Sequence, residues 1–114
     1  MLRDVSSTSY WFSAAMRILT GLLCLIALAF AQDPAEGKKL FETKCGVCHS
    51  TDTPETRIGP SLMGAKTGML SSGKYANRAT ILKRIDEGGN GMPVFRELLT
   101  KEQKENIVSY VLTL

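Results

Sequence analysis

The sequence has few of the side chains that build metal clusters and no long apolar segment. Its 114 residues contain one histidine and three cysteines, and the net charge is only +3. At this length one domain is available, since independent domains typically contain roughly 100–150 residues, so a multidomain enzyme is excluded. With 44% hydrophobic and 22% charged residues, the chain is neither disordered nor a polycationic nucleic-acid-binding arm.

The N-terminal segment, residues 1–31, has the layout of a secretory signal peptide. Arg3 and Arg17 precede the uncharged run ILTGLLCLIALAFA, which ends in the small-x-small sequence Ala29-Phe30-Ala31. This run of about 14 residues is shorter than the roughly 20 that a transmembrane anchor needs. We therefore expect cleavage after Ala31, export across the inner membrane, and a mature periplasmic chain, residues 32–114, with no membrane attachment.

The mature chain is too small to rely on a hydrophobic core alone. At this size a core rarely supplies more than about 3–5 kcal/mol, so a disulfide, a metal or a bulky cofactor is expected. The candidate is the segment Cys45-Gly46-Val47-Cys48-His49, whose C-x-x-C-H pattern is typical of c-type haem attachment. The spacing places both thiols on one face of a helical turn, beside the imidazole. It predicts that Cys45 and Cys48 form thioethers to haem and that His49 is the proximal iron ligand.

Three other interpretations of the two cysteines compete with haem attachment. A thioredoxin-like redox pair needs a βαβ setting, and residues 32–114 show no alternation of strands and helices. A zinc site needs a fourth ligand, but the mature chain has no further Cys or His. A disulfide leaves the adjacent His49 without a role. Haem attachment is favoured because it also agrees with the export signal and the small core.

The single histidine excludes a second histidine as the other axial ligand, which leaves Met, Lys, water or nothing. Met92 is favoured because it follows Gly88-Gly89-Asn90-Gly91 and precedes Pro93. The glycines allow unusual backbone angles and the proline restricts the next step, so such a loop can direct a thioether at iron. Met63 is the alternative, because it and Met69 lack this framing.

With these motifs, the mature chain resembles a small class I cytochrome c over nearly all of residues 32–114. The segment Gly59-Pro60-Ser61-Leu62 matches the family's G-P-x-L pattern and lies between C-x-x-C-H and G-M-P. The resemblance implies an all-α cytochrome c fold, with three main helices around one covalently attached haem. It also implies that the Pro60 carbonyl accepts a hydrogen bond from the His49 ring N–H and that Leu62 packs on the haem.

The helices are also predicted from the residues themselves. Asp33 as N-cap and Pro34 at the first position predict a helix over 34–44. A second helix is expected near 79–87, ended by Gly88, and Thr100 with Gln103 forms a capping box for a last helix. The residues expected to face inward are Leu40, Phe41, Ile81, Leu82, Ile85, Ile107, Tyr110, Val111 and Leu114.

In the family, the first and last helices cross at a small residue beside aromatic side chains. Gly37, Phe41 and Tyr110 match these positions, so the resemblance implies close backbone approach at Gly37. The alternative is a tolerated surface glycine, at a cost of about 1 kcal/mol relative to alanine. Residues 65–77 contain no recognisable motif, which leaves the contacts to the haem propionates open. The candidates for these contacts are Arg57, Lys74, Tyr75 and Arg78.

A haem with both axial positions occupied by protein offers no position for a substrate. The expected function is therefore outer-sphere, one-electron transfer between respiratory-type redox partners, with a potential raised by the thioether ligand and the apolar surroundings. The mature chain carries a net charge of about +2, so strong global steering of partners is not expected. We expect a monomeric or loosely bound carrier, the alternative being a haem subunit within a dehydrogenase or oxidase complex. A haem peroxidase or gas sensor would need the distal position that Met92 closes.

Overall fold

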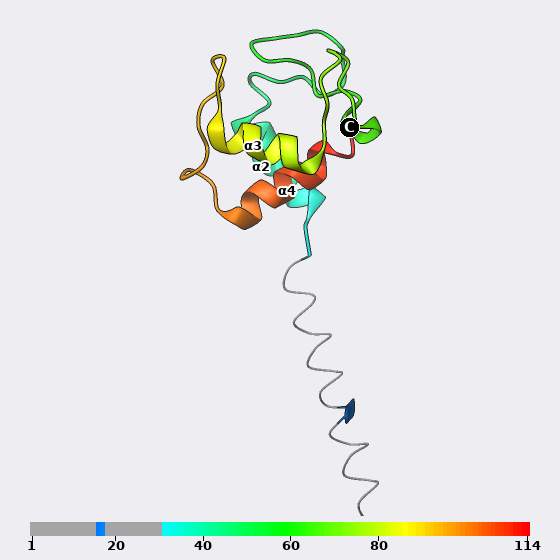
Figure 1. The fold of residues 1–114 in the computed structure, drawn as a ribbon, viewed down its shortest axis with the longest axis vertical. Helices are drawn as coiled ribbons and strands as arrows, with labels where there is room; N and C mark the ends of the chain where they lie inside the picture. The colour runs from blue at the N-terminus through cyan, green and yellow to red at the C-terminus, as the bar shows by residue number, and fades with distance from the viewer. Residues whose placement is uncertain (1–15, 18–30) are drawn as a thin grey trace, which may run out of the picture. The chain divides into compact units, whose positions relative to one another are not determined.

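The computed structural model describes residues 16–17 and 31–114, and its folded unit spans Gln32–Leu114 (Figure 1). This unit contains α2 (Pro34–Lys44), the 3₁₀ helix η1 (Ala65–Thr67), α3 (Arg78–Glu87) and α4 (Lys101–Val111). The described residues contain no strand, only two isolated bridges. The prediction of an all-α fold with three main helices is confirmed. The predicted signal peptide, residues 1–31, lies almost wholly outside the described residues and stays a prediction.

The three helices lie close together, with long loops between them (Figure 1). None of the helices among the described residues is long and apolar enough to cross a membrane. The segment between α2 and α3 forms an extended set of loops, and a shorter loop joins α3 to α4. The residues of the candidate site lie mostly on these loops, so the helices serve as the frame that positions them.

Each helix begins close to the predicted residue, and a capping side chain binds the backbone of its first turn. The carboxylate of Asp33 accepts hydrogen bonds from two backbone N–H groups in the first turn of α2. The predicted capping box of Thr100 with Gln103 is present at the start of α4, with bonds of 3.1 and 2.9 Å. The α3 helix begins one residue earlier than expected because Asn77 and Thr80 form a second capping box, with both bonds at 3.0 Å.

The α2 and α4 helices cross in backbone contact at Gly37. A Cβ at this position would lie 1.9 Å from the carbonyl oxygen of Asn106, so only glycine fits. Beside the crossing, the rings of Phe41 and Tyr110 meet edge to face with their centroids 5.4 Å apart. The buried Asn106 side chain accepts a hydrogen bond of 2.9 Å from the Asp33 N–H and so ties the two helices together. The predicted close approach is confirmed, and the alternative of a surface glycine is wrong.

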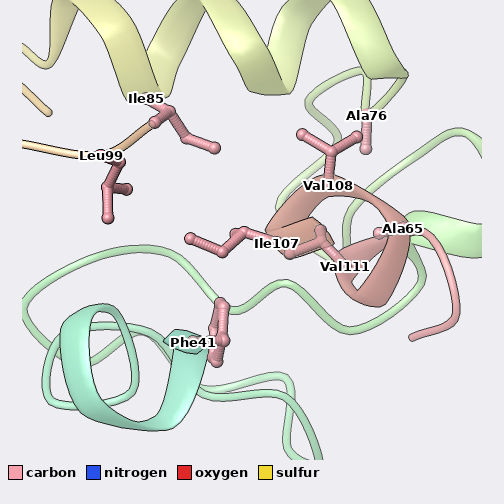
Figure 2. Packing of buried hydrophobic residues seen from close by; sticks show 8 residues of the cluster. All are labelled: Phe41, Ala65, Ala76, Ile85, Leu99, Ile107, Val108 and Val111. Carbon is pink, nitrogen blue, oxygen red and sulfur yellow. The ribbon is translucent and has the colours of Figure 1, made fainter. Parts of the chain in front are cut away.

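The buried core is small and combines the helices with residues from the loops before and after α3. Its members are Phe41, Ala65, Ala76, Ile85, Leu99, Ile107, Val108 and Val111 (Figure 2). The other residues predicted to face inward, among them Leu40 and Tyr110, are half-buried. The sequence prediction missed Val108, because the apolar face of α4 is wider than a single stripe. Figure 2 shows Val108 directed toward α3 and Ala76, on the far side of α4 from Phe41.

The segment 65–77, which shows no motif in the sequence, folds against the end of α4. The N–H of Lys66 donates a hydrogen bond of 2.9 Å to the carbonyl of Leu114. Ala65 and Ala76 are buried at its two ends, and a bridge between Met69 and Tyr75 closes the loop between them. Small buried side chains at both ends let this loop lie close to α4.

Candidate functional site

A cavity of about 500 Å³ lies among the three helices and the loops that follow α2 and α3. Its volume falls within the roughly 300–1,000 Å³ typical of sites for small ligands and cofactors. Five core residues also line this cavity, namely Phe41, Ala76, Ile85, Ile107 and Val111. The core of the folded unit is therefore open on one side, where an apolar occupant would complete it.

All six residues that the sequence analysis assigned to haem line this one cavity. They are Cys45, Cys48, His49, Pro60, Leu62 and Met92. These residues come from three separate stretches of the chain, which the fold brings to the same space. The contact between the G-P-x-L and C-x-x-C-H segments includes a hydrogen bond of 2.8 Å from the Gly59 N–H to the Cys48 carbonyl.

The C-x-x-C-H segment continues directly from the end of α2. The N–H of Cys45 donates to the Phe41 carbonyl at 2.8 Å, and the N–H of His49 donates to the Cys45 carbonyl at 2.9 Å. These bonds keep the segment in a helical turn, which brings both sulfurs and the imidazole to one wall of the cavity. Both cysteines carry free thiols, so the disulfide interpretation finds no support.

Burial raises the pKa of the Cys45 thiol to about 11, and the neighbouring Cys48 adds to the effect. A thioredoxin-like pair depends on a lowered cysteine pKa, because the thiolate is the attacking species. The environment of Cys45 has the opposite effect, and the described residues contain no βαβ unit. Within the same residues, no group of three or more His, Cys, Asp or Glu side chains is arranged to hold a metal ion, which disfavours zinc.

The imidazole of His49 is oriented by two residues of the facing loop. Its Nδ1 lies 2.7 Å from the carbonyl oxygen of Pro60, and this hydrogen bond requires the proton on Nδ1. The lone pair of Nε2 is then free to bind a metal. Gly59 makes room for the ring, because a Cβ there would lie 2.6 Å from His49 Cε1 and 2.9 Å from Nδ1. Gly59 was expected only as the first residue of the G-P-x-L match, and its role in leaving space for the ring was not predicted.

Met92 ends a loop with four consecutive residues in left-handed conformations. The φ angles of residues 88–91 are 62°, 107°, 54° and 88°, so the predicted unusual backbone angles are confirmed. Gly89 and Met92 exchange two backbone hydrogen bonds, of 3.0 and 3.1 Å. Met92 is half-buried and lines the cavity, whereas Met63 is 41% exposed and does not. The geometry favours Met92 over Met63 as an iron ligand.

The charged side chains on the cavity wall are all cationic. They are Lys44, Lys74 and Arg84, and none of them takes part in an ion pair among the described residues. Of the four candidates for propionate contacts, Lys74 and Tyr75 line the cavity, whereas Arg57 and Arg78 do not. Arg78 forms an ion pair with Glu105 instead.

The wall and its donors fit a haem. Aliphatic and aromatic side chains suit the faces of a porphyrin, and unpaired cations suit its carboxylates. Two free thiols, an imidazole with an available Nε2 and one thioether are the donors that haem c uses. The site therefore combines an apolar cavity with the side chains for covalent attachment and axial ligation.

Comparisons with known proteins agree with this chemistry. The family model described as "Cytochrome C oxidase, cbb3-type, subunit III" matches residues 32–111. The chain is 36% identical over 84 residues to a cytochrome c6 of Rippkaea orientalis, covering 74% of this chain and 73% of the relative. It is 31% identical over 112 residues to a cytochrome c6 of Synechocystis, covering 89% and 91%.

A solved structure also resembles this chain. The cytochrome c6 of the diatom Phaeodactylum tricornutum matches with a TM-score of 0.55 and 27% sequence identity. The match covers 71% of this chain and 92% of the diatom protein. The likeness therefore spans nearly all of the solved relative and most of the present sequence.

Proposed function

This chain belongs to the class I cytochrome c family, and from that premise we propose that Cys45 and Cys48 carry its haem c, with His49 and Met92 as the axial ligands of the iron. The chain is a monohaem electron carrier and not an enzyme, with one covalently bound haem. The observation that carries the assignment of residues is their convergence. Both cysteines, the histidine with its available Nε2, and the methionine line one cavity.

When bound, haem c supplies a reversible one-electron couple at its iron. The chain's own residues set the conditions for that couple. Pro60 holds the His49 ring in one tautomer and one orientation, which makes Nε2 a stronger donor. Met92 offers a soft sulfur that favours the reduced metal, and the apolar wall disfavours extra charge, so both raise the reduction potential. Because His49 and Met92 would hold the iron in both oxidation states, the chain would need to rearrange little when the haem gains or loses an electron.

Redox partner proteins dock at the open side of the cavity. Val47, Ile58 and Tyr75 line the cavity, and in the chain alone each is 70–76% exposed. The unpaired cations Lys44 and Lys74 lie on the same wall. A partner whose docking face is apolar at its centre and acidic at its edge complements this arrangement. Transient redox encounters bury little area, so a small patch of this kind is sufficient.

The mature carrier is exported before it acts. The layout of residues 1–31 supports removal of this segment as a signal peptide, which leaves Gln32 as the first residue. Export also takes Cys45 and Cys48 away from the reducing cytosol, where free thiols persist. The alternative, a subunit within a dehydrogenase or oxidase complex, is not favoured, since the curated relatives reported above are cytochromes c6 that match along most of their length.

Covalent attachment of haem tests the proposal most directly. The full chain is expressed in a bacterial host that matures c-type cytochromes, and the exported protein is extracted with acid–acetone. Haem is expected to stay on the wild-type polypeptide and to be lost from the double variant Cys45→Ala/Cys48→Ala. A colourless exported protein that is nevertheless compactly folded would refute the assignment. On size-exclusion chromatography the mature protein should elute as a monomer, and N-terminal sequencing should begin at Gln32.

A further inference from the structure

The loop that carries Met92 has a backbone that needs external support. Gly88 is buried with φ 62° and ψ −142°, and a Cβ there would lie 2.5 Å from the carbonyl oxygen of Met92. Three of the four left-handed residues at 88–91 are glycines, which lose more conformational freedom on ordering than other residues. The position of Met92 at the cavity therefore depends on the contacts that hold this turn.

Arg84, in the last turn of α3, makes such a contact. Its Nη1 donates a hydrogen bond of 2.9 Å to the carbonyl oxygen of Gly88, while the Gly88 N–H donates to the Arg84 carbonyl at 2.8 Å. A Cβ on Gly89 would lie 3.3 Å from the same Nη1, so the guanidinium packs along the backbone of both glycines. Among the hydrogen bonds of the described residues, this is the only one from a side chain to the backbone of residues 88–93.

The positive charge of Arg84 is not neutralised by a carboxylate among the described residues. The neighbouring carboxylate of Asp86 accepts instead from Lys104, at 2.7 Å. None of the four ion pairs among the described residues involves Arg84, although its side chain lines the cavity. A hydrogen bond from a charged donor is stronger than one between neutral groups, so this contact is well suited to hold a strained turn.

We propose that Arg84 is a positioning residue for Met92. By binding the Gly88 carbonyl it holds the turn of residues 88–91 and keeps the Met92 thioether at the cavity. Its loss shifts the equilibrium toward a form in which the loop has moved and the sulfur has left the iron. This inference rests on the proposed ligation of iron by Met92.

Competition with an external ligand measures this equilibrium. Imidazole is titrated into the ferric holoprotein and its apparent affinity is read from the haem absorption spectrum. In Arg84→Met we expect the affinity for imidazole to be about tenfold higher than in the wild type. A hydrogen bond from a charged but exposed donor stabilises the loop by a free energy at the low end of the range for charged hydrogen bonds, and the variant loses this stabilisation. Arg84→Gln keeps an N–H donor without the charge and should restore most of the wild-type affinity. The Arg84 side chain lies outside the core, so both variants should fold.

Two control variants separate the possible outcomes. Lys83→Met removes the same charge from the exposed neighbouring position on α3, which does not line the cavity, and should leave the affinity unchanged. Met92→Ala sets the upper limit for imidazole binding. If Met92→Ala binds more tightly but Arg84→Met stays within twofold of the wild type, the role of Arg84 is overturned while the ligand assignment stands. An equal gain in Lys83→Met also overturns it, since the effect would then be one of charge alone. If Met92→Ala gains no affinity, both proposals fall together.

Discussion

Replacing Gly37 by alanine tests the physical account of the helix crossing, because two principles predict opposite results. In an isolated helix, alanine is more favourable than glycine by about 0.8–1.0 kcal/mol, so propensity alone predicts a more stable protein. In the structure, the added methyl group would lie 1.9 Å from the Asn106 carbonyl oxygen and 2.4 Å from its carbon. We therefore expect Gly37→Ala to be destabilising.

The size of the loss follows from what the methyl group displaces. Contacts of a Cβ below 3.0 Å are essentially never seen, and both colliding groups belong to helix backbones, so α2 and α4 must move apart by roughly 1 Å. Overpacking of this kind typically costs about 1–3 kcal/mol. The movement also weakens the bond from the Asp33 N–H to Asn106 and the contact of Phe41 with Tyr110, each worth about 1 kcal/mol. If both contacts are lost and the gain in propensity is subtracted, the net loss is about 2–4 kcal/mol.

Thermal unfolding of the holoprotein, followed by circular dichroism, measures this loss. For a domain of this size, 1 kcal/mol corresponds to roughly 4–8 °C in Tm, so Gly37→Ala should unfold at least about 8 °C below the wild type. Lys38 supplies the matched control, since it is the next residue on α2 and its side chain is exposed. Lys38→Ala should be more stable than Lys38→Gly by about 1 kcal/mol. If Gly37→Ala is as stable as the wild type, α2 and α4 do not cross in a backbone contact that only glycine permits.

Three further variants test the site and its frame. Met92→Ala should lower the reduction potential and let the ferrous protein bind carbon monoxide, whereas Met63→Ala should behave as the wild type; the opposite pattern would move the ligand to Met63. Gly59→Ala should displace the His49 ring and lower the yield of low-spin holoprotein, measured by absorption spectroscopy. An unchanged spectrum and yield would contradict the claim that only glycine at position 59 leaves room for the ring. Asn106→Leu should cost about 1 kcal/mol in urea unfolding because the part-buried hydrogen bond from the Asp33 N–H at the start of α2 loses its acceptor, and an unchanged midpoint would count against this role.

Local chemistry could be read from the sequence because it depends on neighbouring residues. The capping of α2 by Asp33 and of α4 by Thr100 requires only side chains within a few positions of the backbone groups they bind. The left-handed conformations of residues 88–91 likewise follow from the glycines themselves. The C-x-x-C-H segment is a local pattern too, and its helical turn is as expected.

The tertiary structure determined which distant residues each of these local motifs contacts. The free volume beside the His49 ring depends on Gly59, and the side-chain hydrogen bond to the Met92 loop depends on the conformation of Arg84. Val108 is buried beside Ala76, which belongs to the segment 65–77 whose sequence shows no motif (Figure 2). Such contacts join residues whose proximity no local spacing encodes, because it arises only once the helices have crossed and the loops have closed. The residue types and their order therefore determined the chemistry available to this protein, and packing determined which side chains surround the cavity where that chemistry takes place.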